Sequence, residues 1–547
     1  MNFFQLFKLD SLNGFVVLAI GFFTVLALVY SSKFMQAKRG LVQYYLYMVI
    51  TAICAIGAVL TNNLVLLLFF WGILGLTLYL LVNLGGEGAN LAAKKTFVIV
   101  GGTDALMLLG ISILYFLSGS IQMDEINISL TGNSSGLGLA AYLLIAAACF
   151  AKAGAMPFHS WIPDCADKAP LPVVAYLPAA VDKLLGIYLL ARISLYLFVL
   201  SPAVNMFLMI AGAVTIIAAV MMALIQHNMK RLLGYHAVSQ VGYMLLGIGT
   251  GTAVGIAGAI FHMLNNSIYK QCFFLAAGNV EQKTGTTELN KLGGLAKTMP
   301  ITYISCLFAS FSICGIPPFN GFVSKWMIYQ GVIERLSSGF NGLIVAFCLV
   351  AAMFGSSLTL ASFMKLIHAV FLGQRMNQQE NKEISEVKWQ MWMPPAILAL
   401  ICVVFGVFAN QIPLRYFIQP ILGNIVFSGW YAGVTTLIIM IALFSGVVIF
   451  YLNTKTVYRK DQAFVGGEAL DSDAHAVTGT EFYNTVKDIG LMRMVYKKAE
   501  AGVFDIYEQG KKIFRVSDFL RFLHNGIMPT YLIWMLLGML GLFFFLR

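Results

Sequence analysis

Apolar stretches of about twenty residues recur along this chain and constrain its fold more than any other feature. A run of that length crosses a lipid bilayer as an α-helix, and in lipid only helices or closed barrels satisfy every backbone polar group. The sequence shows no alternating pattern of the barrel type. Of its 547 residues 59% are hydrophobic and 11% charged, whereas a soluble domain carries about 25% charged residues. The sequence therefore predicts an all-α polytopic membrane protein.

The runs predict about fourteen crossings, two of them broken. The run 301–335 is too long for one straight helix and holds Gly315 and Pro317 in its middle, so it is expected to be one broken crossing. The run 137–157 ends at Pro157 and continues into a polar segment. The two broken runs are five crossings apart and therefore antiparallel, which predicts an inverted repeat. The expected crossings are 12–30, 41–60, 63–83, 96–117, 137–157, 171–199, 202–225, 237–252, 255–278, 301–335, 341–371, 393–409, 430–451 and 527–546.

The positive charges predict an orientation. Lysine and arginine gather in loops that fall on one side of the predicted topology, and Asp124 and Glu125 fall on the other. Because cytoplasmic loops carry the excess of positive charge, the N-terminus is expected outside the cell inner (plasma) membrane. The net charge of +11 is then explained by topology and anionic lipid rather than by nucleic acid. The positive loops are 31–40, 84–95, 226–236 and 279–300.

The region after the predicted core differs in character. Over 484–525 apolar residues recur at helical spacing with charged residues between them, as in an amphipathic helix that lies along a membrane or a partner. Gly502 and Gly510 are the positions at which such a helix would bend. The expected domains are a transmembrane core (1–451), a cytoplasmic loop with a long lateral helix (452–526) and a C-terminal transmembrane anchor (527–547).

Three lysines, Lys152, Lys270 and Lys325, stand singly inside apolar helical runs. A lysine at membrane depth costs several kcal/mol unless it is paired, solvated or deprotonated, so such residues are candidates for an ion or proton path. Snorkelling from a position near a helix end is the plainer alternative.

Other reactive residues give no sign of a redox or metal centre. The eight cysteines form no CxxC pair, and no nucleotide loop, haem ligand pair or cluster motif is found in the sequence. The chain is therefore expected to hold no cofactor or metal and to have no catalytic centre of its own. Four histidines are expected to be solvated loop residues: His227, His236, His475 and His524.

Four motifs occur in order and are specific in combination. KAGAMPFHSWIPD begins at Lys152, KRLLGYHAVSQVGY at Lys230, a lysine helix covers 260–278, and a second broken segment covers 293–325. Together they resemble the antiporter-like subunits of respiratory complex I, membrane-bound hydrogenases and multisubunit cation/proton antiporters. The resemblance covers about residues 41–371. The lateral helix and last crossing are similar to the distal type of these subunits.

The resemblance implies a proton relay. Lys152 matches the lysine of the first broken helix, which acts in proton loading. Lys270 matches the central lysine, and Lys325 the lysine that leads to the outside. His262 matches a histidine that bridges the centre, and Asp104 matches an acidic residue near the first lysine.

One departure concerns the first half of the relay. The family has a glutamate where this chain has Gly72, and that glutamate is expected to tune the first lysine. Asp182 and Lys183 are additional intramembrane charges that are expected to take part in the proton relay, and Asp182 or Asp104 is expected to replace the missing carboxylate. Structural pairing is the alternative role for these charges. Further expected channel-lining residues are His159, Asp164, Asn266, which stands in place of a family histidine, and Lys365, for which interfacial anchoring is the alternative.

The resemblance implies an antiporter-like subunit of a redox-driven membrane complex, of the hydrogenase or NADH/ferredoxin oxidoreductase type. It would move H+, with Na+ as a second candidate ion. The alternatives are a subunit of a dedicated multisubunit Na+/H+ antiporter and a structural spacer that has lost transport. Expected partners are other integral membrane subunits, including sister antiporter-like subunits, a peripheral redox module and lipid, but no nucleic acid. Iron–sulfur, nickel or flavin cofactors are expected in partner subunits only.

Overall fold

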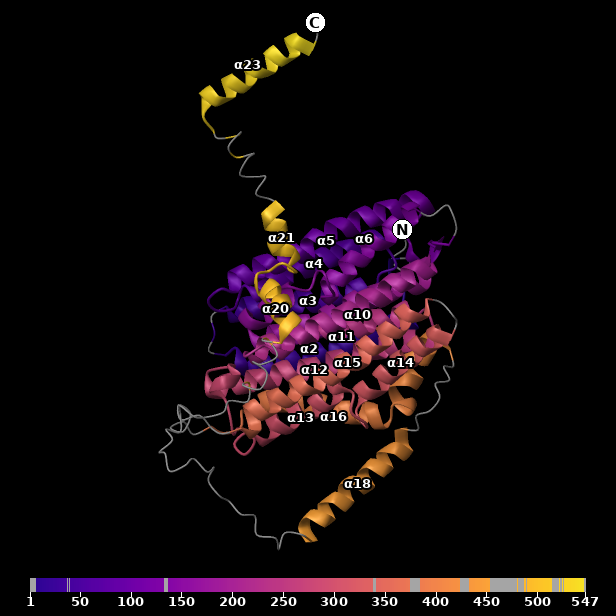
Figure 1. Cartoon of the computed structure of the whole chain (residues 1–547), viewed down its shortest axis with the longest axis vertical. Helices are drawn as coiled ribbons and strands as arrows, with labels where there is room; N and C mark the ends of the chain where they lie inside the picture. The colour runs from indigo at the N-terminus through magenta and orange to yellow at the C-terminus, as the bar shows by residue number, and fades with distance from the viewer. Residues whose placement is uncertain are drawn as a thin grey trace. The chain divides into compact units, whose positions relative to one another are not determined.

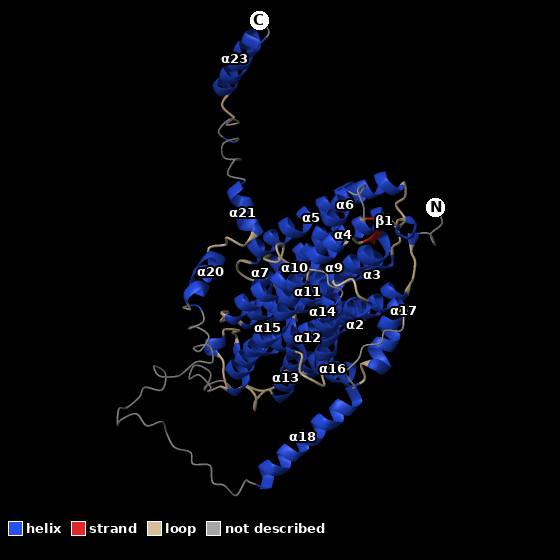
Figure 2. Cartoon of the chain, turned by 45° about the vertical axis from the view of Figure 1, so that its right-hand side comes forward, coloured by secondary structure: helices blue, strands red, loops and turns tan. Residues whose placement is uncertain are grey.

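The computed structural model describes residues 6–36, 38, 40–131, 136–337, 341–373, 384–423, 432–452, 480, 487, 489–513, 521, 524 and 526–545. The chain divides into two compact units, Met1–Ile489 and Gly490–Arg547. Helices dominate both units (Figures 1 and 2). Among the described residues the strands are a two-residue parallel pair, β1 (Ile128–Ser129) and β2 (Phe198–Val199). The predicted all-α polytopic membrane fold is confirmed.

Nine helices of the described part are long and apolar enough to cross a membrane. They begin and end within a few residues of the predicted runs, except α5, which starts one to two turns earlier. They are α2 (Ser11–Phe34), α3 (Leu41–Leu60), α4 (Leu64–Val82), α5 (Ala89–Ser118), α6 (Gly136–Ala153), the composite α8–η2–α9–η3 (Leu171–Leu197), α10 (Pro202–Leu224), α15 with η5 (Gly342–Leu372) and α16 (Trp389–Val407). Two further apolar helices occupy the last two predicted runs, α18 (Ala432–Leu452) and α23 (Met528–Phe545). The full number of crossings stays a prediction.

Two helices that are more polar than the nine, α11 (Met229–Gly249) and α12 (Ala253–Thr284), form the centre of the first unit. Nearly every residue of both is buried, and they are packed among α10, α13, α14 and α16 (Figure 1). Full burial explains how they keep polar side chains, because those groups face protein rather than lipid.

Both predicted broken helices are present. In the first, α6 ends at Ala153, Gly154 adopts φ +79°, and the chain continues through the short helix α7 (Trp161–Lys168). In the second, α13 (Pro300–Cys314) ends before Gly315, whose φ is +77°, and α14 (Asn320–Ser337) follows. A positive φ favours glycine, and it turns the chain out of the helix at each break.

The second unit was expected to hold one long amphipathic helix. Its described part has two, α20 (Gly490–Glu500) and α21 (Ile506–Ile513), separated at Gly502, where φ is +70°. Gly502 thus ends a helix, whereas Gly510 lies within α21. Residues 514–520 of the predicted helix, and most of the predicted domain 452–526, lie outside the described residues. The domain boundaries stay a prediction.

A polar cluster ties the loops at one end of the first unit. Lys8 forms an ion pair with Asp124 at 2.9 Å, and Asn62 donates a hydrogen bond of 2.7 Å to the same carboxylate. The hydrogen bonds from Asn62 and Lys8 hold the pKa of Asp124 below its usual range. At the same end Arg192 pairs with Asp10, the N-cap of α2. These contacts join the chain start to segments more than a hundred residues away.

Candidate functional site

Five of the lysines that the structure describes are enclosed in the first unit: Lys152, Lys183, Lys270, Lys325 and Lys365 are each 2% exposed or less. Their amines therefore do not reach the surface of the chain by snorkelling. A buried ammonium needs a partner or water to offset its lost hydration. The surroundings of each amine thus decide what it can do.

The first group lies at the break after α6. Lys152 Nζ is 3.6 Å from Asp182 Oδ1, and both side chains are buried. The Lys152 amine also lies 5.3 Å from the centre of the Trp71 ring. Within the described residues neither oxygen of Asp182 has a hydrogen-bond partner. A buried carboxylate with open lone pairs is a place where water or a proton is readily accepted.

Lys183, the next residue along α9 (Asp182–Arg192), has a different partner. Its amine donates a 2.6 Å hydrogen bond to the carbonyl of Ala153, the last residue of α6. Helix C-termini leave carbonyls unpaired and carry partial negative charge. Lys183 therefore caps the first broken helix, while Lys152 faces the carboxylate.

Position 72 does not face this group. Gly72 lies on the exposed side of α4, and a Cβ built there would meet nothing within 4 Å. One turn later, a Cβ on Gly75 would be 3.5 Å from Asp104 Oδ2, so Asp104 lies against the inner face of α4. Of the two predicted replacement carboxylates, Asp182 contacts Lys152 directly, and no ion pair of Asp104 is found among the described residues.

The second broken helix places Lys325 in a similar way. Its amine donates to the carbonyl of Ile313 and to Ser356 Oγ, both at 2.8 Å. The amine also lies 4.5 Å from the centre of the Tyr243 ring. Ile313 is in the last turn of α13, so a lysine again meets carbonyls freed at a break.

The centre holds Lys270 and His262, both on α12. Lys270 donates to the carbonyl of Leu233 on α11 at 3.1 Å. His262 bridges two helices, because Nδ1 lies 2.9 Å from Ser324 Oγ and Nε2 lies 3.2 Å from Gln240 Oε1. Ser324 precedes Lys325 in α14, so the histidine connects the centre to the second break.

The four predicted channel-lining residues have distinct positions. Asn266 is buried on α12, and its amide has no hydrogen-bond partner within the described residues. His159 is 7% exposed in the first break. Asp164 pairs with Lys95 at 2.7 Å and Arg231 at 3.2 Å, which joins α7 to α5 and α11. Lys365 donates to the carbonyls of Leu224, at 2.5 Å, and Gln226, at 2.9 Å, at the end of α10.

The prediction that His236 is a solvated loop residue is wrong. The side chain is fully buried on α11, and Nε2 lies 2.7 Å from Ser362 Oγ on α15. Hydropathy placed the helix start near residue 237, but α11 begins at Met229. The signal was present in the sequence, since Asn228 is an N-cap whose side chain accepts from the amides of Lys230 and Arg231.

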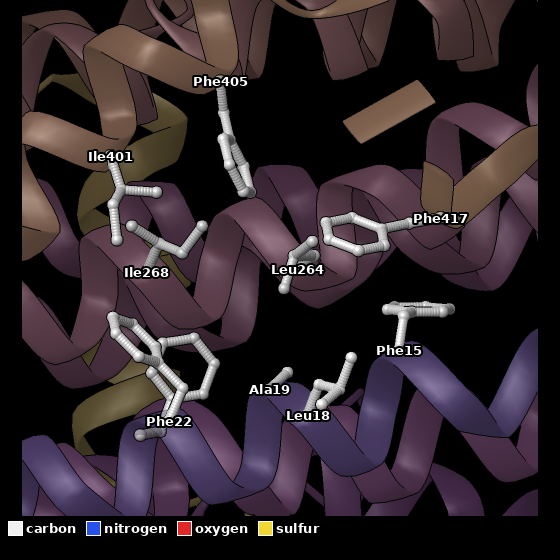
Figure 3. Close-up of a pocket in the computed structure, with 10 residues that line it drawn as sticks. Phe15, Leu18, Ala19, Phe22, Leu264, Ile268, Ile401, Phe405 and Phe417 are labelled. Carbon is white, nitrogen blue, oxygen red and sulfur yellow. The ribbon is translucent and has the colours of Figure 1, made fainter. Parts of the chain in front are cut away.

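An apolar cavity of about 200 Å³ lies between α2, α12, α16 and η7 (Asn410–Ile418). Phe15, Phe22, Leu264, Phe405 and Phe417 are among its lining residues (Figure 3). No titratable side chain is among those residues. The cavity is therefore a separate feature from the lysine groups.

More than half of the chain matches one protein family. Residues 61–355 match the family model described as NADH:quinone oxidoreductase/Mrp antiporter, TM. The chain belongs to this family. The predicted recognition is confirmed, and the chain is an antiporter-like membrane protein of the complex I and Mrp type.

Among the relatives of this antiporter-like chain is a Na(+)/H(+) antiporter subunit of Alkalihalophilus pseudofirmus, 29% identical over 93% of the chain and 68% of the relative. A Na(+)/H(+) antiporter subunit of Bacillus subtilis is 31% identical over 78% of the chain. The chain spans 56% of the Bacillus subtilis relative and 52% of a further one from Staphylococcus haemolyticus.

Many solved structures share the fold, among them three that match most of this chain. The membrane-bound sulfane sulfur reductase, an archaeal respiratory membrane complex, matches with a TM-score of 0.82, 24% identity and coverage of 98% of this chain and 89% of that one. The Mrp complex from Dietzia sp. DQ12-45-1b matches with a TM-score of 0.69, 21% identity and coverage of 76% and 84%. Respiratory complex I from Thermus thermophilus matches with a TM-score of 0.64, 19% identity and coverage of 76% and 86%.

Proposed function

We propose that this chain is the ion-translocating subunit of a multisubunit membrane complex that exchanges Na+ for H+, and that buried lysines relay the proton. The relatives named as Na+/H+ antiporter subunits favour this function over the redox-driven complex that the sequence first suggested. The redox-driven complex shares the fold and stays the alternative.

The observation that carries the proposal is the series of amines between the two breaks. Lys152 pairs with Asp182, and Lys270 lies at the centre. Lys325 donates a hydrogen bond to the carbonyl of Ile313, which the helix break leaves free. Each amine has a partner weak or incomplete enough to be exchanged for water. A proton can then move along the series as the pairings alternate.

A packing role explains this arrangement poorly. A spacer gains nothing from isolated ammonium groups, each of which costs several kcal/mol at membrane depth unless it is compensated. The retention of all three lysines, each fully enclosed, supports transport instead.

The roles follow from the contacts. Asp182 adjusts the proton affinity of Lys152, and Lys183 stabilises the C-terminal end of α6. Lys270 and His262 connect the two halves of the relay. Lys325 releases the proton on the far side of the membrane. Asp104 contributes negative charge near Trp71. The channel-lining residues His159, Asp164, Asn266 and Lys365 are proposed to order water along the path.

The proposed setting is a bacterial plasma membrane with the N-terminus outside and residues 452–526 in the cytoplasm. Other integral membrane subunits, sister subunits among them, and lipid surround the chain. Under the redox alternative a peripheral module carries the iron–sulfur, nickel or flavin groups. The subunit composition of the purified complex decides between the two, since such a module is expected only for the alternative.

The test uses the intact complex in proteoliposomes, with Na+-driven proton movement followed by a pH-sensitive dye. Lys270→Gln and Asp182→Asn are each expected to lower the rate by about tenfold or more, as when a proton-transfer group is removed. Lys94→Gln is the matched control, because Lys94 is exposed on α5. Full transport by both assembled variants would contradict the proposal.

A further inference from the structure

α15 carries a polar stripe of which the proposed function uses only the two ends, Ser356 beside Lys325 and the channel-lining Lys365. The stripe consists of Ser356, Thr359, Ser362 and Lys365, each three residues from the next, and Ser356 is the only one that is not fully enclosed. At 1.5 Å per residue it extends about 13 Å along the helix. Residues three apart are about 60° short of a full turn, so the stripe winds about the helix axis.

Because of that winding, the stripe meets three different helices in turn. Ser356 accepts from Lys325 on α14, Ser362 meets His236 on α11, and Lys365 donates to the carbonyls at the end of α10. Thr359, between them, bonds its own helix at Gly355. One end of the stripe thus touches the relay at Lys325. The other end reaches Gln226, which is half-buried at the start of the loop between α10 and α11.

His236 lies midway along this stripe. Its Nε2 is 2.7 Å from Ser362 Oγ, and its ring centre is 4.7 Å from that of Phe363. Lys270 Nζ is 5.6 Å from the centre of the same Phe363 ring, so the histidine and the central lysine share one side chain as a neighbour. The second nitrogen, Nδ1, is buried and has no hydrogen-bond partner within the described residues.

Within the described residues the charged groups acting on the imidazole are three lysines, Lys270 on α12, Lys325 on α14 and Lys365 on α15, and no carboxylate is among them. His236 is therefore not held in place by an ion pair. Most buried polar side-chain atoms have a hydrogen-bond partner, from protein or ordered water. Here one nitrogen has a hydroxyl and the other is open.

We propose that His236 and the α15 polar stripe form a proton inlet that connects the Lys365 end of the stripe to the central lysine Lys270. This inference deepens the proposed function and rests on it. A proton arriving by the Lys365 end enters Ser362 Oγ, and the hydroxyl passes its own proton to Nε2. The imidazolium then releases the Nδ1 proton through a bridging water to Lys270 Nζ, which accepts it as a neutral amine and becomes an ammonium. One proton and its charge move to Lys270, the imidazole is left neutral with its proton on Nε2, and a half-turn of the ring about the Cβ–Cγ bond restores an acceptor nitrogen toward Ser362 before the next transfer.

The test compares variants of the intact complex in proteoliposomes. His236→Gln keeps a hydrogen bond for Ser362 but cannot carry a proton, so we expect transport to fall about tenfold or more with normal assembly. Ser362→Ala, which leaves the imidazole in place but removes its contact, is expected to lower transport in the same direction. His368→Gln is the matched control, since His368 is exposed near the end of the same helix.

Transport at the wild-type rate by assembled His236→Gln would overturn the inlet, because a structural histidine is rescued by glutamine and a proton carrier is not. If His236→Gln does not assemble, wild-type transport by Ser362→Ala would overturn it equally. A wild-type complex that moves no protons would overturn the proposed function itself, and this outcome is separate from both.

Discussion

At the scale of single residues, the buried amines share a solution to desolvation. Lys183, Lys325 and Lys365 each donate to a carbonyl in the last turn or just beyond the end of a helix, at Ala153, Ile313 and Leu224. These carbonyls are free because a helix ends at each of them, α6 and α13 at the two breaks and α10 at the loop before α11. The breaks therefore create the electrostatic environment in which a lysine is tolerated.

Lys152 is different, since its partner is the carboxylate of Asp182. Breaking a buried pair leaves an uncompensated charge, whereas replacing both members by apolar residues is often neutral. We expect Lys152→Met and Asp182→Leu each to lower the apparent Tm of the purified complex more than the double variant does. The interaction energy is expected to be about 1–3 kcal/mol, in the range for residues in contact. Additive shifts in Tm would show that the two side chains do not stabilise each other.

At the scale of elements, α10 and α11 approach closely at a pair of glycines. A Cβ on Gly242 would be 2.5 Å from the carbonyl oxygen of Gly212, and one on Gly212 would be 2.6 Å from that of Gly242. This contact fixes α11 against α10, and α11 carries both His236 and the carbonyl that receives Lys270. Small residues allow such close approach of helices in membranes.

Gly242→Ala is therefore expected to destabilise the protein by about 1–3 kcal/mol, as overpacking does. Gly72→Ala is the matched control, because nothing lies within 4 Å of its added Cβ and alanine is the better helix former. Thermal unfolding of the two purified variants measures the difference. Equal loss of stability in both would mean that the glycine contact does not determine how α10 and α11 pack.

The sequence predicted the helices better than it predicted the site. Hydropathy located the membrane helices and both breaks, because length and proline placement act locally. It missed the first two turns of α11, where Lys230 and Arg231 precede His236 and pair with Glu281 on α12 and Asp164 on α7. It also could not show that Asp182 would face Lys152 while the next residue, Lys183, capped α6, since adjacent residues on a helix point in different directions. Which of several charges meet depends on how distant helices pack.

At the scale of the whole molecule, α5 separates two loops that can be labelled independently. Its thirty residues measure about 45 Å, longer than the roughly 30 Å of membrane hydrocarbon. Glu87, before α5, and Asn127, after it, are both exposed. All eight native cysteines are buried, so a membrane-impermeant maleimide would report on an introduced cysteine at either position.

With the N-terminus outside, Glu87→Cys is expected to label in inverted vesicles and Asn127→Cys in intact cells. Wild-type protein, which should stay unlabelled in both, is the control. Labelling of both variants from one side would contradict the path of α5 across the membrane. A complete exchange of the two results would keep the fold but reverse the orientation.

The same experiment determines which way the proposed inlet faces. Asp164 pairs with Lys95 near the start of α5 and with Arg231 near the start of α11. The loop at Glu87 and the loop before α11 are therefore at the same end of the helices. Lys365 donates to Gln226 in that second loop. If Glu87 is cytoplasmic, the stripe opens to the cytoplasm and carries protons inward to Lys270, and Lys325 is left to deliver them to the other side.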